Sequence, residues 1–190
     1  MNRRSAVKRV AILMGGALSA STLAAMLDSC QTKPRGGSGP QFSEDEDQLI
    51  SRMADLLIPK TDTPGALEAG VPPFIVMMMQ ECYGPEDQKQ FHEGLQAFNK
   101  QCQTKLGAGF LKLDAAKQLQ ALTDLDSQVL SKRGLAKDDP LNSCRYFKEL
   151  TLLGCFSSKP GATETLRYVK IPGRYDGDIP YHKGERAWAT

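Results

Sequence analysis

Hydrophobic residues after position 43 recur at spacings of three and four residues, the pattern of amphipathic helices that bury one face. The first helix is predicted to begin at Ser43, because Ser43 and Glu46 form an S-x-x-E capping box that satisfies free backbone N–H groups of the first turn. Pro59 is predicted to close this segment, because proline cannot continue a helix. The face that recurs along it comprises Leu49, Ile50, Met53, Leu56 and Leu57.

Two further helices are predicted after a turn at residues 61–65. Pro72 and Pro73 suit a first helical turn, and the apolar run from Phe74 to Cys82 continues it. Pro85 opens the next helix, with acidic residues near its positive end. In the helix that begins near Pro72, we expect the three methionines to pack in the core: Met77, Met78 and Met79. In the helix that begins at Pro85, we expect one face to be buried: Phe91, Leu95, Phe98 and Cys102.

Two more helices complete the predicted domain. Asp114 is predicted to cap a helix that continues until Gly134, and another helix is predicted from about Asn142 to Phe156. Their apolar stripes are predicted to be Leu119, Leu122, Asp126 and Val129 or Leu130 in the first, and Tyr146, Phe147, Leu150 and Leu153 in the second. No alternating strand pattern of useful length is present, so the sequence predicts an all-α fold: a small helical domain with an irregular, aromatic-containing C-terminal tail, preceded by a signal helix and a flexible tether.

The helical pattern of hydrophobic residues ends at Ser157, where the predicted tail begins. Two prolines and two glycines among residues 172–180 forbid a regular helix, and residues 166–169 are compatible with extended chain. The tail nevertheless carries apolar area in Tyr168, Tyr175, Tyr181 and Trp188. It can wrap its own helical core, or it can also present aromatic anchors to another subunit, and the residues alone favour the first interpretation.

The N-terminus resembles a twin-arginine export signal over residues 1–29. Arg3 and Arg4 precede a weakly apolar stretch from Val10 to Leu27 that glycines, serines and a threonine soften. A transmembrane anchor is the alternative, because the charge-free run approaches the roughly 20 residues that span a bilayer. The many small residues favour the signal.

Cys30 is the expected lipid-anchor cysteine, because residues 27–30 resemble a lipobox. Residues 30–42 then form the lipid-anchor cysteine and a flexible linker, whose Gly, Pro and Ser cannot pack a core. Cleavage at a small-residue site near Ala24, or no cleavage, are the alternatives. The N-terminal features together predict a periplasmic, membrane-anchored lipoprotein exported by the twin-arginine route.

Charge and cysteine content narrow the expected partners. Four basic residues and one acidic residue lie in the first 29, so the rest of the chain carries 20 basic and 21 acidic side chains, which gives no electrostatic footprint for nucleic acid.

The four later cysteines allow three complete disulfide pairings, and free thiols are an equally weighted alternative. The two histidines of the chain lie far apart, which argues against a structural zinc site. The four cysteines are Cys82, Cys102, Cys144 and Cys155.

No nucleophile elbow, phosphate-binding loop, dinucleotide fingerprint or haem-attachment motif is present in the sequence. The paired acids Asp138–Asp139 and Asp176–Asp178 are read as a helix cap and a turn rather than as catalytic carboxylates. The sequence therefore predicts no catalytic residue, no metal site and no cofactor bound by this chain.

Several segments together resemble the gluconate 2-dehydrogenase subunit 3 family. They cover most of residues 43–190 and comprise residues 54–66, 69–72 with Phe74, 148–154, 156–158 with Gly161, Tyr168, 172–177 and 187–189. The resemblance implies a small accessory subunit of a membrane-associated dehydrogenase of the glucose-methanol-choline type, whose large flavoprotein subunit holds FAD and oxidises a sugar or polyol. A cytochrome c subunit is a further partner that the resemblance allows. Asp178 stands where many relatives have cysteine, so a covalent or disulfide role of that loop does not carry over.

The expected role is therefore that of a non-catalytic subunit that binds, matures or exports, and anchors the flavin-dependent dehydrogenase. Pro172 and Gly173 are expected to fix the path of the tail, and Tyr168, Tyr175 and Trp188 are the candidate interface residues. Two alternatives stay open at this point: a free-standing lipoprotein that acts as a scaffold, and an enzyme with an unrecognised site.

Overall fold

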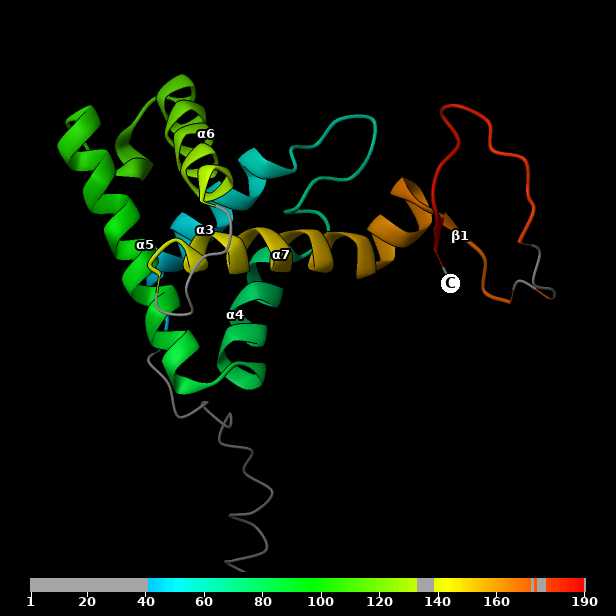
Figure 1. The fold of residues 1–190 in the computed structure, drawn as a ribbon, viewed down its shortest axis with the longest axis horizontal. Coiled ribbons are helices and arrows are strands. Elements are labelled where there is room, and N and C mark those ends of the chain that lie inside the picture. Colours follow the sequence, from blue (N-terminus) through cyan, green and yellow to red (C-terminus); the bar gives the residue numbers. More distant parts are fainter. Residues whose placement is uncertain (1–40, 133–138, 172, 174–176, 190) are drawn as a thin grey trace, which may run out of the picture. The chain divides into compact units, whose positions relative to one another are not determined.

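The computed structural model describes residues 41–132, 139–171, 173 and 177–189 (Figure 1). The predicted export signal with Arg3 and Arg4, and the predicted lipid anchor Cys30, lie outside the described residues. The same holds for Pro172 and Tyr175 among the candidate interface residues.

The described chain is mostly helical, which confirms the all-α prediction for the domain. Its one pair of described strands is only two residues long on each side. The elements in order are α3 (Glu44–Leu57), α4 (Val71–Cys82), α5 (Pro85–Leu106), the 3₁₀ turn η1 (Phe110–Lys112), α6 (Ala115–Ser131), α7 (Asn142–Ser157), the π-helical turn η2 (Gly161–Thr165), β1 (Arg167–Tyr168) and β2 (Trp188–Ala189).

The helix starts follow the local signals in the sequence. Ser43 and Glu46 form the predicted capping box: the Glu46 N–H donates to the Ser43 hydroxyl over 3.3 Å, and the Ser43 N–H donates to the Glu46 carboxylate over 2.9 Å. Asp114 caps α6 by accepting from the Lys117 N–H over 2.9 Å. These predictions are confirmed because each depends on residues within one helical turn.

The connection between α3 and α4 is held by its own backbone. The Ala66 N–H donates to the Ile58 carbonyl over 2.8 Å, and the Val71 N–H donates to the Ala66 carbonyl over 3.0 Å. Gly65 allows this tight path, because a Cβ there would lie 2.6 Å from the Lys60 backbone nitrogen. The backbone hydrogen bonds and the tight path of this loop therefore explain its conformation between residues 58 and 71.

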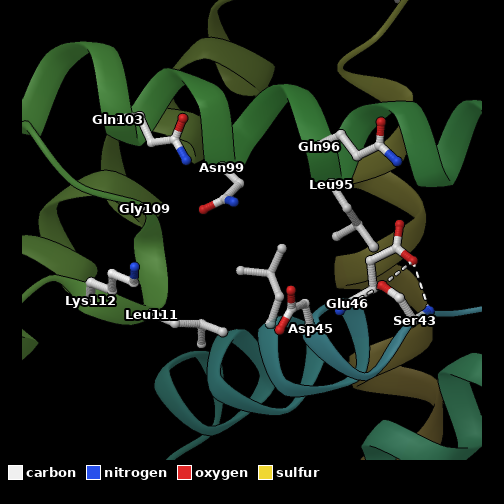
Figure 2. Close-up of a pocket in the computed structure, with 11 residues that line it drawn as sticks. Ser43, Asp45, Glu46, Leu95, Gln96, Asn99, Gln103, Gly109, Leu111 and Lys112 are labelled. Carbon is white, nitrogen blue, oxygen red and sulfur yellow. Dashed lines mark hydrogen bonds between the residues drawn. The ribbon is translucent and has the colours of Figure 1, made fainter.

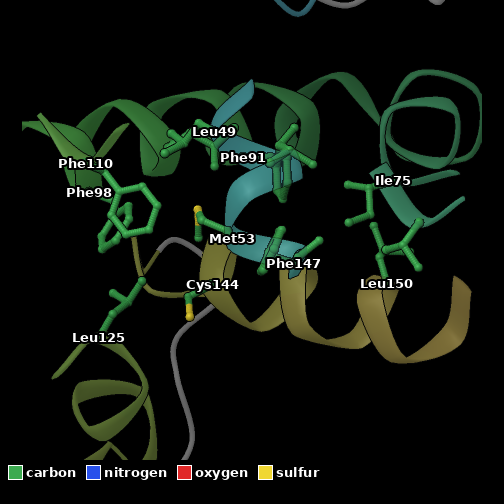
Figure 3. Packing of buried hydrophobic residues seen from close by; sticks show 14 of the residues in the cluster. Leu49, Met53, Ile75, Phe91, Phe98, Phe110, Leu125, Cys144, Phe147 and Leu150 are labelled. Atoms are coloured by element: carbon green, nitrogen blue, oxygen red, sulfur yellow. The ribbon is translucent and has the colours of Figure 1, made fainter. Parts of the chain in front are cut away.

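Helix α7 packs against α4 and α5, and buried side chains of the three helices meet between them (Figure 3). Phe91 of α5, Ile75 of α4 and Leu150 of α7 are fully or almost fully buried between these helices, and Phe110 of η1 closes the far end of the core. Burial of each such side chain contributes about 1.5 to 3 kcal/mol relative to its exposed state. The core thus fixes the mutual positions of the surfaces described below.

The predicted inward face of α6 is wrong at Leu119, and of the alternatives Val129 and Leu130 it is Val129 that packs against the core. Leu119 and Leu130 are 54% and 71% exposed, whereas Gln118, Ala121 and Leu125 are buried. Gln118 is held inside because its amide donates to the Phe110 carbonyl over 3.0 Å and accepts from Arg52 over 2.8 Å. A buried polar side chain with two hydrogen-bond partners has therefore taken the position that hydrophobic spacing assigned to leucine.

Two further residues predicted to be buried are exposed. Leu153 of α7 is 51% exposed and Met77 of α4 is half exposed, whereas Met79 is fully buried as expected. The inward side of α7 at this level is formed by Thr151 and Gly154, where a Cβ on Gly154 would lie 2.6 Å from the Phe74 ring. The close approach of α4 leaves no room there for a leucine.

The four cysteines of the described domain are free thiols. Cys102, Cys144 and Cys155 are buried and Cys82 is exposed. Of the two alternatives for these four residues, the structure therefore supports free thiols, and it contains none of the three disulfide pairings.

Candidate partner interface

The aromatic residues of the tail do not enter the helical core. Tyr168 is 47% exposed, Tyr181 is 78% exposed and Trp188 is 49% exposed. The interpretation that the tail wraps its own core is therefore wrong for these three side chains. Their apolar surface is available to another molecule.

A short parallel pairing brings two of the candidate interface residues together. Arg167 pairs with Trp188, and Tyr168 pairs with Ala189. The Arg167 guanidinium lies 4.0 Å from the centre of the Trp188 ring, which is a cation–π contact. Even a full two-stranded hairpin is marginally stable in water, so a ladder of two residues on each strand has little stability of its own.

Gly173, another candidate, has φ of +76°, a backbone conformation that side-chain-bearing residues rarely adopt. This is the only interface candidate between β1 and β2 that falls on a described residue. A glycine suits this backbone conformation because it has no Cβ.

The end of α7 carries exposed apolar residues that the sequence analysis missed. Leu152, Leu153 and Phe156 are all exposed. Helix η2 packs against this end of α7, and β1 adjoins η2, so the exposed residues are followed directly by the tail (Figure 1). The available signal was the density of apolar residues from Leu150 to Phe156, which is too wide for one face of a helix.

An apolar groove lies between α3, α6 and α7. Its cavity of about 160 Å³ is lined mainly by hydrophobic side chains, and the ion pair of Lys148 with Asp126 lies at its wall. The lining residues are Met53, Leu56, Leu57, Leu119, Leu122, Thr123, Asp126, Cys144, Phe147 and Lys148. Burial raises the pKa of the Cys144 thiol to about 11, so this thiol is not a ready nucleophile.

A second, larger cleft lies between α3, α5 and η1 and has a cavity volume of about 560 Å³ (Figure 2). Side-chain amides of α5 form one wall, and Asp45, Leu111 and Lys112 lie across from them. Glu46 stands at the end of this cleft and accepts hydrogen bonds from Ser43, with the His92 ring nitrogen 3.0 Å away. Burial raises the pKa of Glu46, but the hydrogen bonds from the Ser43 backbone and from His92 outweigh it, so the pKa lies below its usual value.

Asp139 lies in the turn that precedes α7, where its carboxylate accepts from the Leu141 N–H and from Lys132, each over 3.0 Å. The N-cap of α7 is Leu141 and has no side-chain cap, so the prediction that this acid caps a helix is wrong. Within residues 41–132, 139–171, 173 and 177–189, no group of three or more His, Cys, Asp or Glu side chains could hold a metal ion. No helix in that part of the chain is long and apolar enough to cross a membrane.

A small helical domain whose apolar side chains remain exposed at the end of its last long helix and along its tail has the character of a subunit that assembles with another protein. The family described as gluconate 2-dehydrogenase subunit 3 matches residues 44–173, and the chain belongs to this family. The name of the family indicates that its members are subunits of a dehydrogenase complex. Comparisons with curated proteins and with solved structures gave no match.

Proposed function

We propose that this chain is a non-catalytic accessory subunit that binds a large FAD-containing dehydrogenase of the glucose-methanol-choline type. Membership of the subunit 3 family carries the proposal. The FAD and the oxidation of a sugar or polyol belong to the partner, and this chain binds no cofactor itself. A cytochrome c subunit that accepts electrons from the flavoprotein is a further partner in this proposal.

The exposed apolar residues at the C-terminal end support a binding role. Leu152, Leu153 and Phe156 of α7 and the aromatic residues of the tail would be covered in the complex. Aromatic side chains give wide, rigid contact surfaces whose ordering costs little conformational entropy. Our candidates for the contact are Tyr168, Pro172, Gly173, Tyr175 and Trp188.

The N-terminal sequence supports roles in export and attachment. Arg3 and Arg4 provide a twin-arginine signal that would carry the folded complex across the membrane, and Cys30 would be acylated to hold it there. A single acyl chain binds membranes only marginally, so we propose a fully processed cysteine with several acyl chains. The complex would then be a periplasmic, membrane-anchored lipoprotein assembly.

The export role is tested by following both subunits in cells that express the Arg3→Lys/Arg4→Lys double variant. Lysine keeps the charge but lacks the planar guanidinium, so transport should stop. Both this chain and the flavoprotein subunit are then expected in the cytoplasm. Lys8→Arg is the matched control, because it changes a nearby basic residue and leaves the arginine pair intact.

Undiminished export of both subunits by the double variant would reject the twin-arginine assignment. Loss of this chain alone from the periplasm, with normal export of the flavoprotein, would reject its role as the carrier of the partner.

A further inference from the structure

The cleft between α3, α5 and η1 carries a row of amide side chains along one side of α5. Gln96, Asn99 and Gln103 occupy positions i, i+3 and i+7, so they lie on the same side of the helix (Figure 2). In the part of the chain that the structure describes, the side chains of Gln96 and Gln103 make no hydrogen bond. Asn99 uses its oxygen to accept from the Phe110 N–H over 2.9 Å, and its NH₂ group remains free of described partners.

The spacing of this row fits an extended polypeptide. Residues 96 and 103 are separated by a helical rise of about 10.5 Å, and three residues of extended chain cover about 10 Å. Each amide side chain offers both a donor and an acceptor, as a peptide group does. A backbone that runs along α5 can therefore pair with successive side chains of the row.

The rest of the cleft suits the side chains of such a peptide. Leu49 and Leu95 form its apolar floor and are themselves almost fully buried, and Leu111 stands exposed at its edge. Asp45 supplies a negative charge on the α3 wall, and Lys112 supplies a positive charge at η1. The preferred peptide therefore carries a basic side chain toward α3 and an acidic side chain toward η1.

A small polyol is the competing occupant, because its hydroxyl groups can also pair with amide side chains. None of the described residues that line the cleft is aromatic, so the cleft offers no ring on which a sugar could stack. The amide row from Gln96 to Gln103, about 10.5 Å long, matches a repeating backbone better than a compact ligand.

We propose that this cleft binds an extended segment of the dehydrogenase's catalytic subunit, with the peptide backbone hydrogen-bonded to Gln96, Asn99 and Gln103. The identity of the partner rests on the proposed function. The site lies on the helical domain and is formed by elements other than α7 and the tail. The complex would thus use a peptide cleft in addition to the apolar contacts of the C-terminal end.

The first test places a photo-reactive benzoylphenylalanine at position 96 or 103 of the full chain and irradiates the complex with the FAD-containing subunit. Both positions are expected to cross-link to one short stretch of that subunit, at sites about three to four residues apart. The same group at Gln120, an exposed glutamine of α6 outside the cleft, is the control and should give no such cross-link.

The second test measures affinity for the same FAD-containing subunit with the double variant Gln96→Met/Gln103→Met. Methionine keeps the length and helix propensity of glutamine but cannot pair with a backbone, so binding should weaken about tenfold or more. The melting temperature should stay that of the parent. Gln120→Met should change neither quantity.

The outcomes separate this inference from the proposed function. If the parent chain binds no flavoprotein, the proposed function is wrong. If the parent binds and the Met double variant binds equally well, the cleft is not a peptide site. Gluconate that binds the parent chain alone, and no longer binds the double variant, would replace the peptide with a polyol.

Discussion

Gly94 lies where α5 and α7 pack together, and we expect Gly94→Ala to destabilise the domain. A Cβ at this position would lie 1.9 Å from the Ser143 Oγ and 2.2 Å from the Ser143 Cβ, whereas ordinary contact begins at 3.4 Å. A change of rotamer could move the hydroxyl but not the Ser143 Cβ, which is fixed to the backbone of α7. The two helices must therefore separate by about 1 Å or more, which opens the core between them.

The size of the effect follows from two opposing contributions. Overpacking of this kind costs about 1 to 3 kcal/mol, and the upper end applies because backbone-fixed atoms collide. Alanine gains about 1 kcal/mol over glycine in a helix interior. The free energy of unfolding should therefore fall by about 2 kcal/mol, and the melting temperature by about 4 to 8 °C for a chain of this size.

A double-mutant cycle with Ser143→Gly isolates the contact. Ser143→Gly removes both colliding atoms, so Gly94→Ala in that background should keep only its gain in helix propensity and stabilise by about 1 kcal/mol. Thermal unfolding followed by circular dichroism gives all four values. A Gly94→Ala variant as stable as the parent, or the same effect in both backgrounds, would refute the close approach of α5 and α7.

Three further predictions concern the anchor, the tail and the start of the domain. Cys30→Ser should release the protein from membranes, and an intact mass showing an unmodified Cys30 in the parent would contradict this. Trp188→Ala should leave the melting temperature unchanged and weaken binding to the flavoprotein by about 2 kcal/mol, roughly 30-fold. The control Leu130→Ala, at an exposed position of α6, should leave binding unchanged. Unchanged binding of the Trp188→Ala variant would exclude Trp188 from the interface. The folded-state pKa of Glu46 is lowered from 4.5, so its stabilising contribution is present above the unfolded pKa and is lost as the pH falls through the folded value. Unfolding between about pH 5 and 3 should therefore show a smaller loss of stability for Glu46→Gln than for the parent, and parallel curves would contradict the pairing with Ser43 and His92.

The elements that the sequence predicted correctly are those that depend on neighbouring residues. The capping box of Ser43 and Glu46, the Asp114 cap and the proline-started helices are confirmed because each is decided within one turn. Hydrophobic spacing also identified the buried face of α5, a helix of 22 residues in which Phe91, Leu95, Phe98 and Cys102 are all buried. Local chemistry was sufficient in all these cases.

The errors occur where tertiary partners decide which residue is buried. Gln118 is held inside by Phe110 and Arg52, which are distant in sequence from one another, and Leu119 is exposed as a result. The amide row on α5 was also not found from the sequence, because its significance depends on α3 and η1 forming the opposite wall. Single-residue spacing carries no information about either arrangement.

We propose that this chain assembles with an FAD-containing dehydrogenase and does no redox chemistry itself. The most direct measurement is purification of the tagged full chain from its native membranes, followed by determination of FAD content and dye-linked oxidation of sugars and polyols. We expect a stable complex with one flavoprotein subunit, FAD in equal amount to this chain, and activity that is absent from the chain alone. A chain that purifies without a flavoprotein, or that oxidises a sugar by itself, would overturn the proposed function.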